Sequence, residues 1–151
     1  MQRRRSGLGN KTRPSRAPVI QGEPTGCGIA SVAAIAGVSY SNARIAAAAL
    51  GIRASDKTLW SQTAPVRRLL RHFGWAARNA ETPFRSWNAL PDLALLAIKW
   101  HRVRGKAYWH WVVFVREGDC AYVLDSKRSL RRHTRTDFGR IKPKWHIRVA
   151  R

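Results

Sequence analysis

A run of small apolar residues follows the glycine-flanked turn at residues 25–28, and it predicts the first helix of the chain. The run covers residues 28–36, and Thr25 or Gly26 can begin it. Gly37 stands directly after the last apolar position, where a helix commonly ends. We therefore expect a short, largely buried helix here.

Two more helices are predicted from capping residues and apolar periodicity. One covers residues 42–50, with Ser41 as its N-cap and Gly51 as its C-terminal stop. The other covers residues 64–73 and ends at Gly74. Its apolar positions recur at helical spacing and form one face: Val66, Leu69, Leu70 and Phe73.

The second half of the chain has short, nearly continuous apolar runs rich in branched and aromatic residues. Such runs at residues 93–100 and 108–115 are typical of central strands, and shorter ones occur at 122–124 and 145–149. Helices come first and strands later, which indicates an α+β fold in which N-terminal helices pack on a C-terminal antiparallel sheet.

A turn at residues 116–119 predicts a hairpin, and its register brings two polar side chains together. If the turn is centred on this segment, Val115 lies opposite Cys120 and His110 lies opposite Asp125. A shift of the turn centre by one residue would make the last two diagonal neighbours on the same face. In either register a carboxylate can orient an imidazole.

The two cysteines, Cys27 and Cys120, are predicted to have different roles. They are too few for a disulfide scaffold and lie in no metal-ligand motif, so we expect no metal and no cofactor. Strand parity points Cys120 away from the His110 face, as a small core residue. Cys27 begins a helix, where a thiolate is stabilised, although burial as a small apolar residue is an equal alternative.

Length and charge place the chain among folded basic proteins. Its 151 residues carry a formal net charge of +21, yet 44% are hydrophobic, which excludes a disordered chain. It has no apolar run long enough to span a membrane and no apolar segment for secretion. We expect a soluble cytoplasmic protein; a virion or an organelle is also compatible with the sequence.

The basic residues are concentrated at both ends. Residues 1–18 hold six basic and no acidic residues, which predicts a flexible basic arm or, alternatively, an organellar transit peptide. Residues 19–151 are then one folded domain. Its end, residues 127–151, has ten basic residues and one acid, a charge that attracts nucleic acid or another polyanion without sequence specificity.

The remaining aromatic and histidine residues are interpreted structurally. The group Trp100, Tyr108, Trp109 and Trp111 is expected in the core rather than in a stacking platform. The other tryptophans are too scattered to assign. Four histidines lack any ligand spacing and are expected to be structural or on the surface: His72, His101, His133 and His146.

Three motifs in order resemble a papain-like cysteine peptidase, most of all peptidase family C39, which cleaves double-glycine leader peptides. Gln21 stands six residues before Cys27 at a helix start. His110 opens the strand sequence His-Trp-Val-Val-Phe, and Asp125 ends the next strand. The resemblance covers about residues 19–127, and it departs from the family at Gly26 and Ser126, where an acidic or polar residue and a proline are usual.

The resemblance implies a catalytic role for each of these residues. Cys27 would be the nucleophile, His110 the base, and Asp125 the group that fixes the imidazole tautomer. Gln21 would donate its side-chain amide to the oxyanion. The function so implied is a cysteine peptidase acting on an unidentified peptide or protein, with related amidase, deamidase or transferase chemistry also possible. The alternative is a catalytically silent module of this fold that binds nucleic acid or a polyanionic partner through its basic termini.

Overall fold

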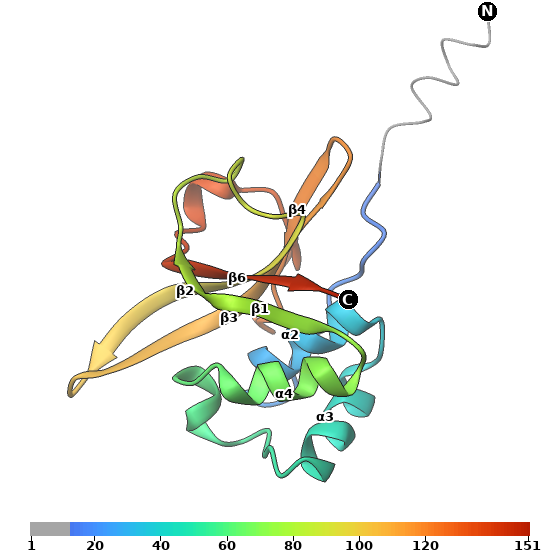
Figure 1. The fold of residues 1–151 in the computed structure, drawn as a ribbon, viewed down its shortest axis with the longest axis vertical. Coiled ribbons are helices and arrows are strands. Elements are labelled where there is room, and N and C mark those ends of the chain that lie inside the picture. The colour runs from blue at the N-terminus through green and yellow to red at the C-terminus, as the bar shows by residue number, and fades with distance from the viewer. Residues whose placement is uncertain (1–12) are drawn as a thin grey trace, which may run out of the picture.

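A six-stranded antiparallel sheet carries helices on one face in the computed structural model, which describes residues 13–151 (Figure 1). The strand order across the sheet is β1-β6-β2-β3-β4-β5. The α-helices are α2 (Cys27–Ala36), α3 (Tyr40–Ala49) and α4 (Ala64–His72), and the 3-10 turns are η1 (Lys57–Trp60) and η2 (Phe138–Arg140). The strands are β1 (Ala76–Pro83), β2 (Leu93–Val103), β3 (Lys106–Glu117), β4 (Cys120–Leu124), β5 (Thr134–Arg135) and β6 (Trp145–Ala150).

The predicted α+β arrangement is confirmed, with one helix start corrected. Helix α2 begins after Gly26 and ends at Gly37. The φ angle of Gly37 is 73°, in the left-handed region that glycine adopts readily because it has no side chain. Helix α3 begins two residues before the predicted start. Its N-cap is Ser39 and not Ser41, because the Ser39 side chain accepts a hydrogen bond from the backbone nitrogen of Asn42 at 3.0 Å.

The predicted strands are present, and two further strands were not predicted. β1 has the sequence AARNAETP, which contains no branched aliphatic residue, and it forms at the sheet edge by pairing with β6. β5 is only two residues long and pairs with the end of β4. β1 depends on a neighbour far away in the sequence, and β5 is too short to leave a local pattern, so neither is indicated by the residues around it.

The turn of the β3–β4 hairpin is centred one residue later than predicted, so the strand register differs. Val115 lies opposite Tyr122 and not Cys120, because the turn is centred on Gly118 and Asp119. Gly118 has a φ of 61°, which favours glycine at this position. His110 and Asp125 are consequently diagonal neighbours on one face rather than directly opposed.

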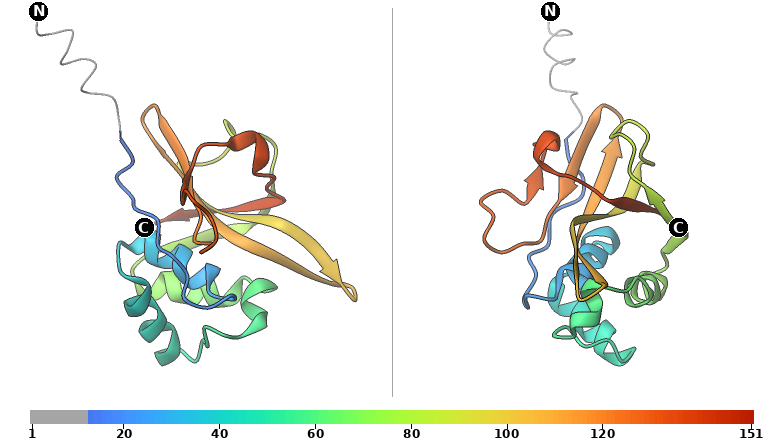
Figure 2. Two further views of the ribbon diagram at one scale, coloured as in Figure 1. Left: turned by 180° about the vertical axis from the view of Figure 1, so that it is seen from behind. Right: turned by 90° about the vertical axis from the view of Figure 1, so that its left-hand side faces the viewer.

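Both faces of the sheet are covered (Figure 2). On the helix side, Trp109, Trp111 and Trp145 pack edge to face with ring centroids 5.0 to 5.6 Å apart, so the expected aromatic core is present for the first two. Trp100 and Tyr108, expected beside them, are only half-buried. On the other side, Trp87 and Phe138 cover the sheet with ring centroids 4.7 Å apart.

The hairpin of β2 and β3 extends well beyond the rest of the sheet (Figures 1 and 2). Its pairing is regular as far as Ile98, is interrupted, and resumes at His101. Lys99, inside this bulge, has a φ of 54°, which is unusual for a residue with a side chain. The hairpin thereby forms one wall of a cleft described below.

The chain before the first helix already contacts the folded domain. Ser15 donates a backbone hydrogen bond to Glu117 at 3.0 Å, and the guanidinium of Arg16 lies 5.1 Å from the ring centroid of Trp75. Residues 1–12 of the predicted arm lie outside the described part of the chain. Within residues 13–151, no helix has the length and apolarity needed to cross a membrane.

Candidate active site

Cys27 lies at the first turn of α2, and a glycine brings this turn against the sheet. A Cβ at Gly28 would come within 2.8 Å of Val66 and 3.2 Å of the Trp111 side chain, so only glycine allows this close approach. The Trp111 indole is itself held by a 3.1 Å hydrogen bond to the carbonyl of Leu59. The start of the helix is therefore fixed against β3, next to His110.

The sulfur of Cys27 is enclosed. The backbone N–H of Trp111 donates to Sγ at 3.5 Å, and the residue has 0% of its surface exposed. Cys27 also lies at the N-terminus of α2, where the helix end carries a partial positive charge. Because the sulfur is covered, a neighbouring group has to move before an external molecule reaches it.

His110 joins Cys27 to a carboxylate. Its Nε2 lies 2.8 Å from Oδ1 of Asp125, and only 14% of its side chain is exposed. Burial alone would lower the pKa of His110, but hydrogen bonds to Asp125 and Cys27, together with their negative charges, raise it to about 9. The arrangement therefore favours an imidazolium between a sulfur and a carboxylate at neutral pH.

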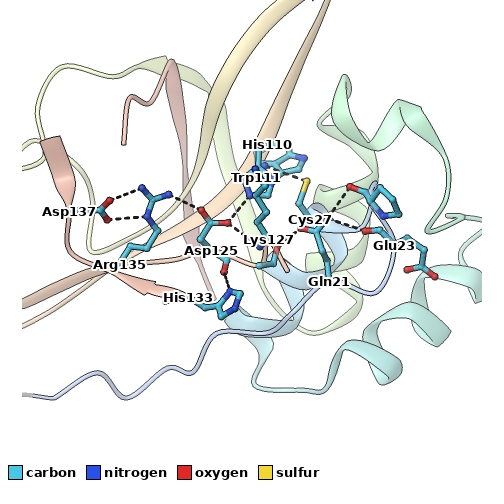
Figure 3. Close-up of polar contacts among 12 residues, drawn as sticks. Gln21, Glu23, Cys27, His110, Trp111, Asp125, Lys127, His133, Arg135 and Asp137 are labelled. Atoms are coloured by element: carbon cyan, nitrogen blue, oxygen red, sulfur yellow. Dashed lines mark hydrogen bonds and ion pairs between the residues drawn. The ribbon is translucent and has the colours of Figure 1, made fainter. Parts of the chain in front are cut away.

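Asp125 is buried and fully hydrogen-bonded (Figure 3). Besides His110, it accepts bonds from the backbone nitrogen of Lys127 at 3.2 Å and from Nη1 of Arg135 at 2.9 Å. Burial by itself would raise the pKa of Asp125, yet these donors and the positive charges lower it to about 2. The carboxylate stays ionised throughout the ordinary pH range.

Asp125 is held in place by three residues that sequence reasoning did not identify as part of the site: Arg135, His133 and Asp137. Asp137 accepts two bonds from the Arg135 guanidinium, at 3.0 and 2.8 Å, on the side away from Asp125. His133 lies 2.8 Å from the Asp125 carbonyl through Nδ1, and its own carbonyl accepts from the Asp125 backbone nitrogen at 2.8 Å. His133 is thus structural, as expected, but it supports the site directly.

Gln21 lies beside Cys27, and its amide is engaged by its own loop (Figure 3). Its Nε2 donates to the carbonyls of Glu23 at 3.0 Å and Pro24 at 2.9 Å, and only 6% of the residue is exposed. Ser126 donates to the Gln21 Oε1 at 2.8 Å, which fixes the orientation of the amide. Ser126 therefore links the segment of Asp125 to the segment that precedes Cys27.

A cleft of about 670 Å³ opens beside His110. The inner side of the β2–β3 hairpin forms one wall, and the turn η1, the loop at residues 21–24 and the turn at residues 127–129 form the others. Its aromatic lining is Trp60, Tyr108 and Trp109. The volume of the cleft lies within the range of ligand-binding pockets in proteins.

The structure brings the four sequence-predicted site residues into one region, and it places Cys120 elsewhere. Cys120 is half-buried against the helix-side core, as the strand parity predicted. Burial and the nearby charges of Glu117 and Asp119 raise its pKa. Among the described residues, no group of three or more His, Cys, Asp or Glu side chains is arranged to hold a metal ion.

Comparisons with known proteins give one informative match. No protein-family model matches the chain, and no curated protein matches it significantly. A solved structure does: the crystal structure of a double glycine motif protease from an AMS/PCAT transporter, in complex with its leader peptide. The match covers 93% of this chain and 94% of that one, with a TM-score of 0.53 and 17% sequence identity. This chain therefore has the fold of that protease, the papain-like fold that the resemblance predicted.

Proposed function

We propose that this protein is a cysteine peptidase in which Cys27, His110 and Asp125 form the catalytic triad. The observation that carries the proposal is the 2.8 Å contact between His110 and Asp125, next to a cysteine at a helix start. The shared fold with a double glycine motif protease supports the same reaction class, and that protein's leader peptide supports a peptide substrate here.

The arrangement supports acyl transfer in two steps. The Cys27 thiolate attacks the substrate carbonyl carbon, and the His110 imidazolium gives its proton to the leaving amine nitrogen as the C–N bond breaks. A thioester on Cys27 remains. His110, now neutral, takes a proton from water as the water oxygen attacks the thioester, and the C–S bond breaks to return the thiolate and the imidazolium. Asp125 holds the ring orientation throughout.

The oxyanion of each tetrahedral intermediate requires hydrogen-bond donors. We propose that the backbone N–H of Cys27 and the side-chain amide of Gln21 supply them. Both N–H groups of the Gln21 amide donate to the loop carbonyls of Glu23 and Pro24 in this structure. Substrate binding therefore has to replace at least one of these contacts, and the same loop movement would open the way to the covered sulfur.

The test is the pH dependence of alkylation of native protein by iodoacetamide, followed by peptide mass spectrometry. Labelling of Cys27 is expected to continue below pH 7 with little change in rate, because the imidazolium keeps the sulfur ionised. A slow opening of the loop would lower the rate at every pH and leave the shape of the profile unchanged. Cys120 serves as the internal control, and its labelling should rise steeply with pH.

The His110→Ala variant completes the test. It should lose the low-pH labelling of Cys27 and retain the labelling of Cys120. The opposite result would be labelling of Cys27 with a midpoint near the ordinary thiol pKa of about 8.5 or above, unchanged in the variant. The triad would then not be functional, and the silent binding module would become the better interpretation.

A further inference from the structure

The cleft beside His110 has a marked excess of positive charge. Besides His110, four lysine and arginine side chains line it: Lys57, Lys99, Lys127 and Arg128. Among the described residues, none of the four takes part in an ion pair. Their charge is therefore available to a ligand in the cleft.

The acidic residues near the cleft already have partners. Glu23, the only carboxylate among the described residues of its lining, forms a 2.8 Å ion pair with Arg44 and accepts a hydrogen bond from Tyr40. Asp125, outside the lining, forms ion pairs with His110 at 2.8 Å and with Arg135 at 2.9 Å. The chain has only eight acidic residues in all, so few carboxylates compete for the cations of the cleft.

Lys99 and Lys127 line the same cleft as His110. They come from two different elements, the hairpin bulge and the segment after β4, and Figure 3 shows Lys127 close to Asp125. The neighbouring Lys127 side chain lowers the pKa of Lys99. Two ammonium groups that line one cleft repel each other, and an anion bound near both would relieve the repulsion.

The backbone at Lys99 also favours a functional reading of this pair. A φ of 54° at a residue with a side chain costs free energy, and such conformations persist mainly where surrounding structure enforces them. The bulge contributes a carbonyl contact as well, because Lys99 O lies 2.9 Å from Nδ1 of the neighbouring His101. The irregular backbone thus places a cation in the lining of the cleft that His110 also lines.

We infer that Lys99 and Lys127 form a carboxylate subsite, so that the preferred substrate is an acidic peptide with an Asp or Glu side chain near the bond cleaved. This inference rests on the proposed peptidase function and names its substrate class. Apolar substrate residues would contact Trp60 and Tyr108, while the carboxylate lies between the two ammonium groups. Lys57 and Arg128, at other points of the lining, extend the preference to further acidic positions.

The first experiment compares turnover of matched peptide libraries by the whole chain. Internally quenched octapeptide libraries with Asp or Glu fixed at one position are set against libraries with Asn or Gln there. Cleavage of the best acidic library is expected to be about tenfold faster, as for a charge-assisted contact, and the advantage should shrink at high salt. It should be lost in Lys99→Gln/Lys127→Gln and kept in Arg71→Gln/Lys142→Gln, which removes the same charge from exposed positions outside the cleft.

The second experiment measures binding without turnover. A Cys27→Ser variant is titrated with the same libraries carrying a neutral dye, and fluorescence anisotropy is read with and without a single-stranded poly(U) competitor. Binding of the acidic library that depends on Lys99 and Lys127 supports the subsite even if no library is cleaved, in which case only the peptidase function fails. Cleavage with no acid preference, or an acid preference that the double variant retains, overturns the subsite and leaves the peptidase function intact. Lysine-dependent binding of poly(U) without any binding of acidic peptides also overturns it, in favour of a nucleic-acid ligand.

Discussion

The two ends of the β3–β4 strand pair differ in the charges that surround a cysteine. At the turn end, Cys120 is half-buried, and burial together with the nearby carboxylates of Glu117 and Asp119 raises its pKa. At the other end, Cys27 meets the strand pair at His110, whose pKa is raised to about 9. Cys27 is fully buried and Cys120 half-buried, so exposure alone would favour Cys120 as the reactive thiol. The charges placed around each sulfur by turns and neighbouring segments decide which one is suited to catalysis.

Alanine substitution of each cysteine tests this difference most strongly. Cys27→Ala is expected to lower kcat/KM for peptide cleavage by about 10⁴-fold or more, because the nucleophile is removed. Cys120→Ala should leave kcat/KM unchanged within about twofold. Each substitution removes one small buried group and should cost roughly 1 kcal/mol of stability or less, which thermal unfolding of both variants will measure. Equal activity losses in the two variants would contradict the assignment.

Asp125→Asn removes the carboxylate that holds His110, at the end of the strand pair near Cys27, and leaves the nucleophile and the base in place. The carboxylate raises the pKa of His110, so its loss should lower that pKa and reduce kcat/KM by about a hundredfold. The imidazolium is present below the His110 pKa, so activity is expected to fall as the pH rises through about 9 in the wild type, and at lower pH in the variant.

The same substitution should also change how the free energy of unfolding depends on pH. A raised His110 pKa contributes stability fully below its ordinary value of 6.5, and this contribution is lost as pH rises through about 9. Asp125, with its pKa lowered to about 2, contributes stability above 3.8 that is lost as the pH falls. Urea unfolding from pH 2 to pH 10 should therefore show flatter limbs at both extremes in Asp125→Asn, and unchanged limbs would argue against the pair.

Arg135→Gln tests a positioning residue one step further from the sulfur. Losing this guanidinium should raise the pKa of Asp125 and loosen its orientation, and we expect kcat to fall about tenfold with KM nearly unchanged. The acid limb of the pH–rate profile should move to higher pH. Arg135→Lys should recover part of the loss because it restores a charge, whereas the exposed Arg131→Gln should have no effect. A fall in thermal stability alone, with kcat and the acid limb unchanged, would make Arg135 merely structural.

The sequence predicted the α+β fold and the shared face of His110 and Asp125 because local patterns determine both, although β1 and β5 were missed. Strand parity alone kept His110 and Asp125 on one face, even though the turn is centred one residue later than predicted. The start of α2 followed from the glycines that flank Cys27. Such features depend on neighbours in the chain and tolerate small errors of register.

The supports of the site depend on contacts that no local pattern encodes. Arg135 is one of ten basic residues after position 126, and only pairing of β5 with β4 brings it to Asp125. Ser126 was noted as a departure from the family, but its bond to Gln21 depends on the packing of two distant segments. The place of Lys99 in the cleft lining depends on a strand bulge, which the apolar run around it did not indicate.

Removing a single charge at the turn end, that of Asp119, tests the comparison of the two cysteines with the smallest expected effect. Asp119 is exposed, and its carboxylate is one of the causes that raise the pKa of Cys120. Asp119→Asn should therefore lower that pKa and speed alkylation of Cys120 at pH 8 by about twofold in low salt, since exposed charges interact weakly. The effect should disappear at about 0.5 M salt, where screening is strong. Labelling of Cys27 in the same sample is the control, and it should not change. If Cys27 labelling changed in parallel, the two environments would be coupled, and charge near each sulfur would not be what separates the two cysteines.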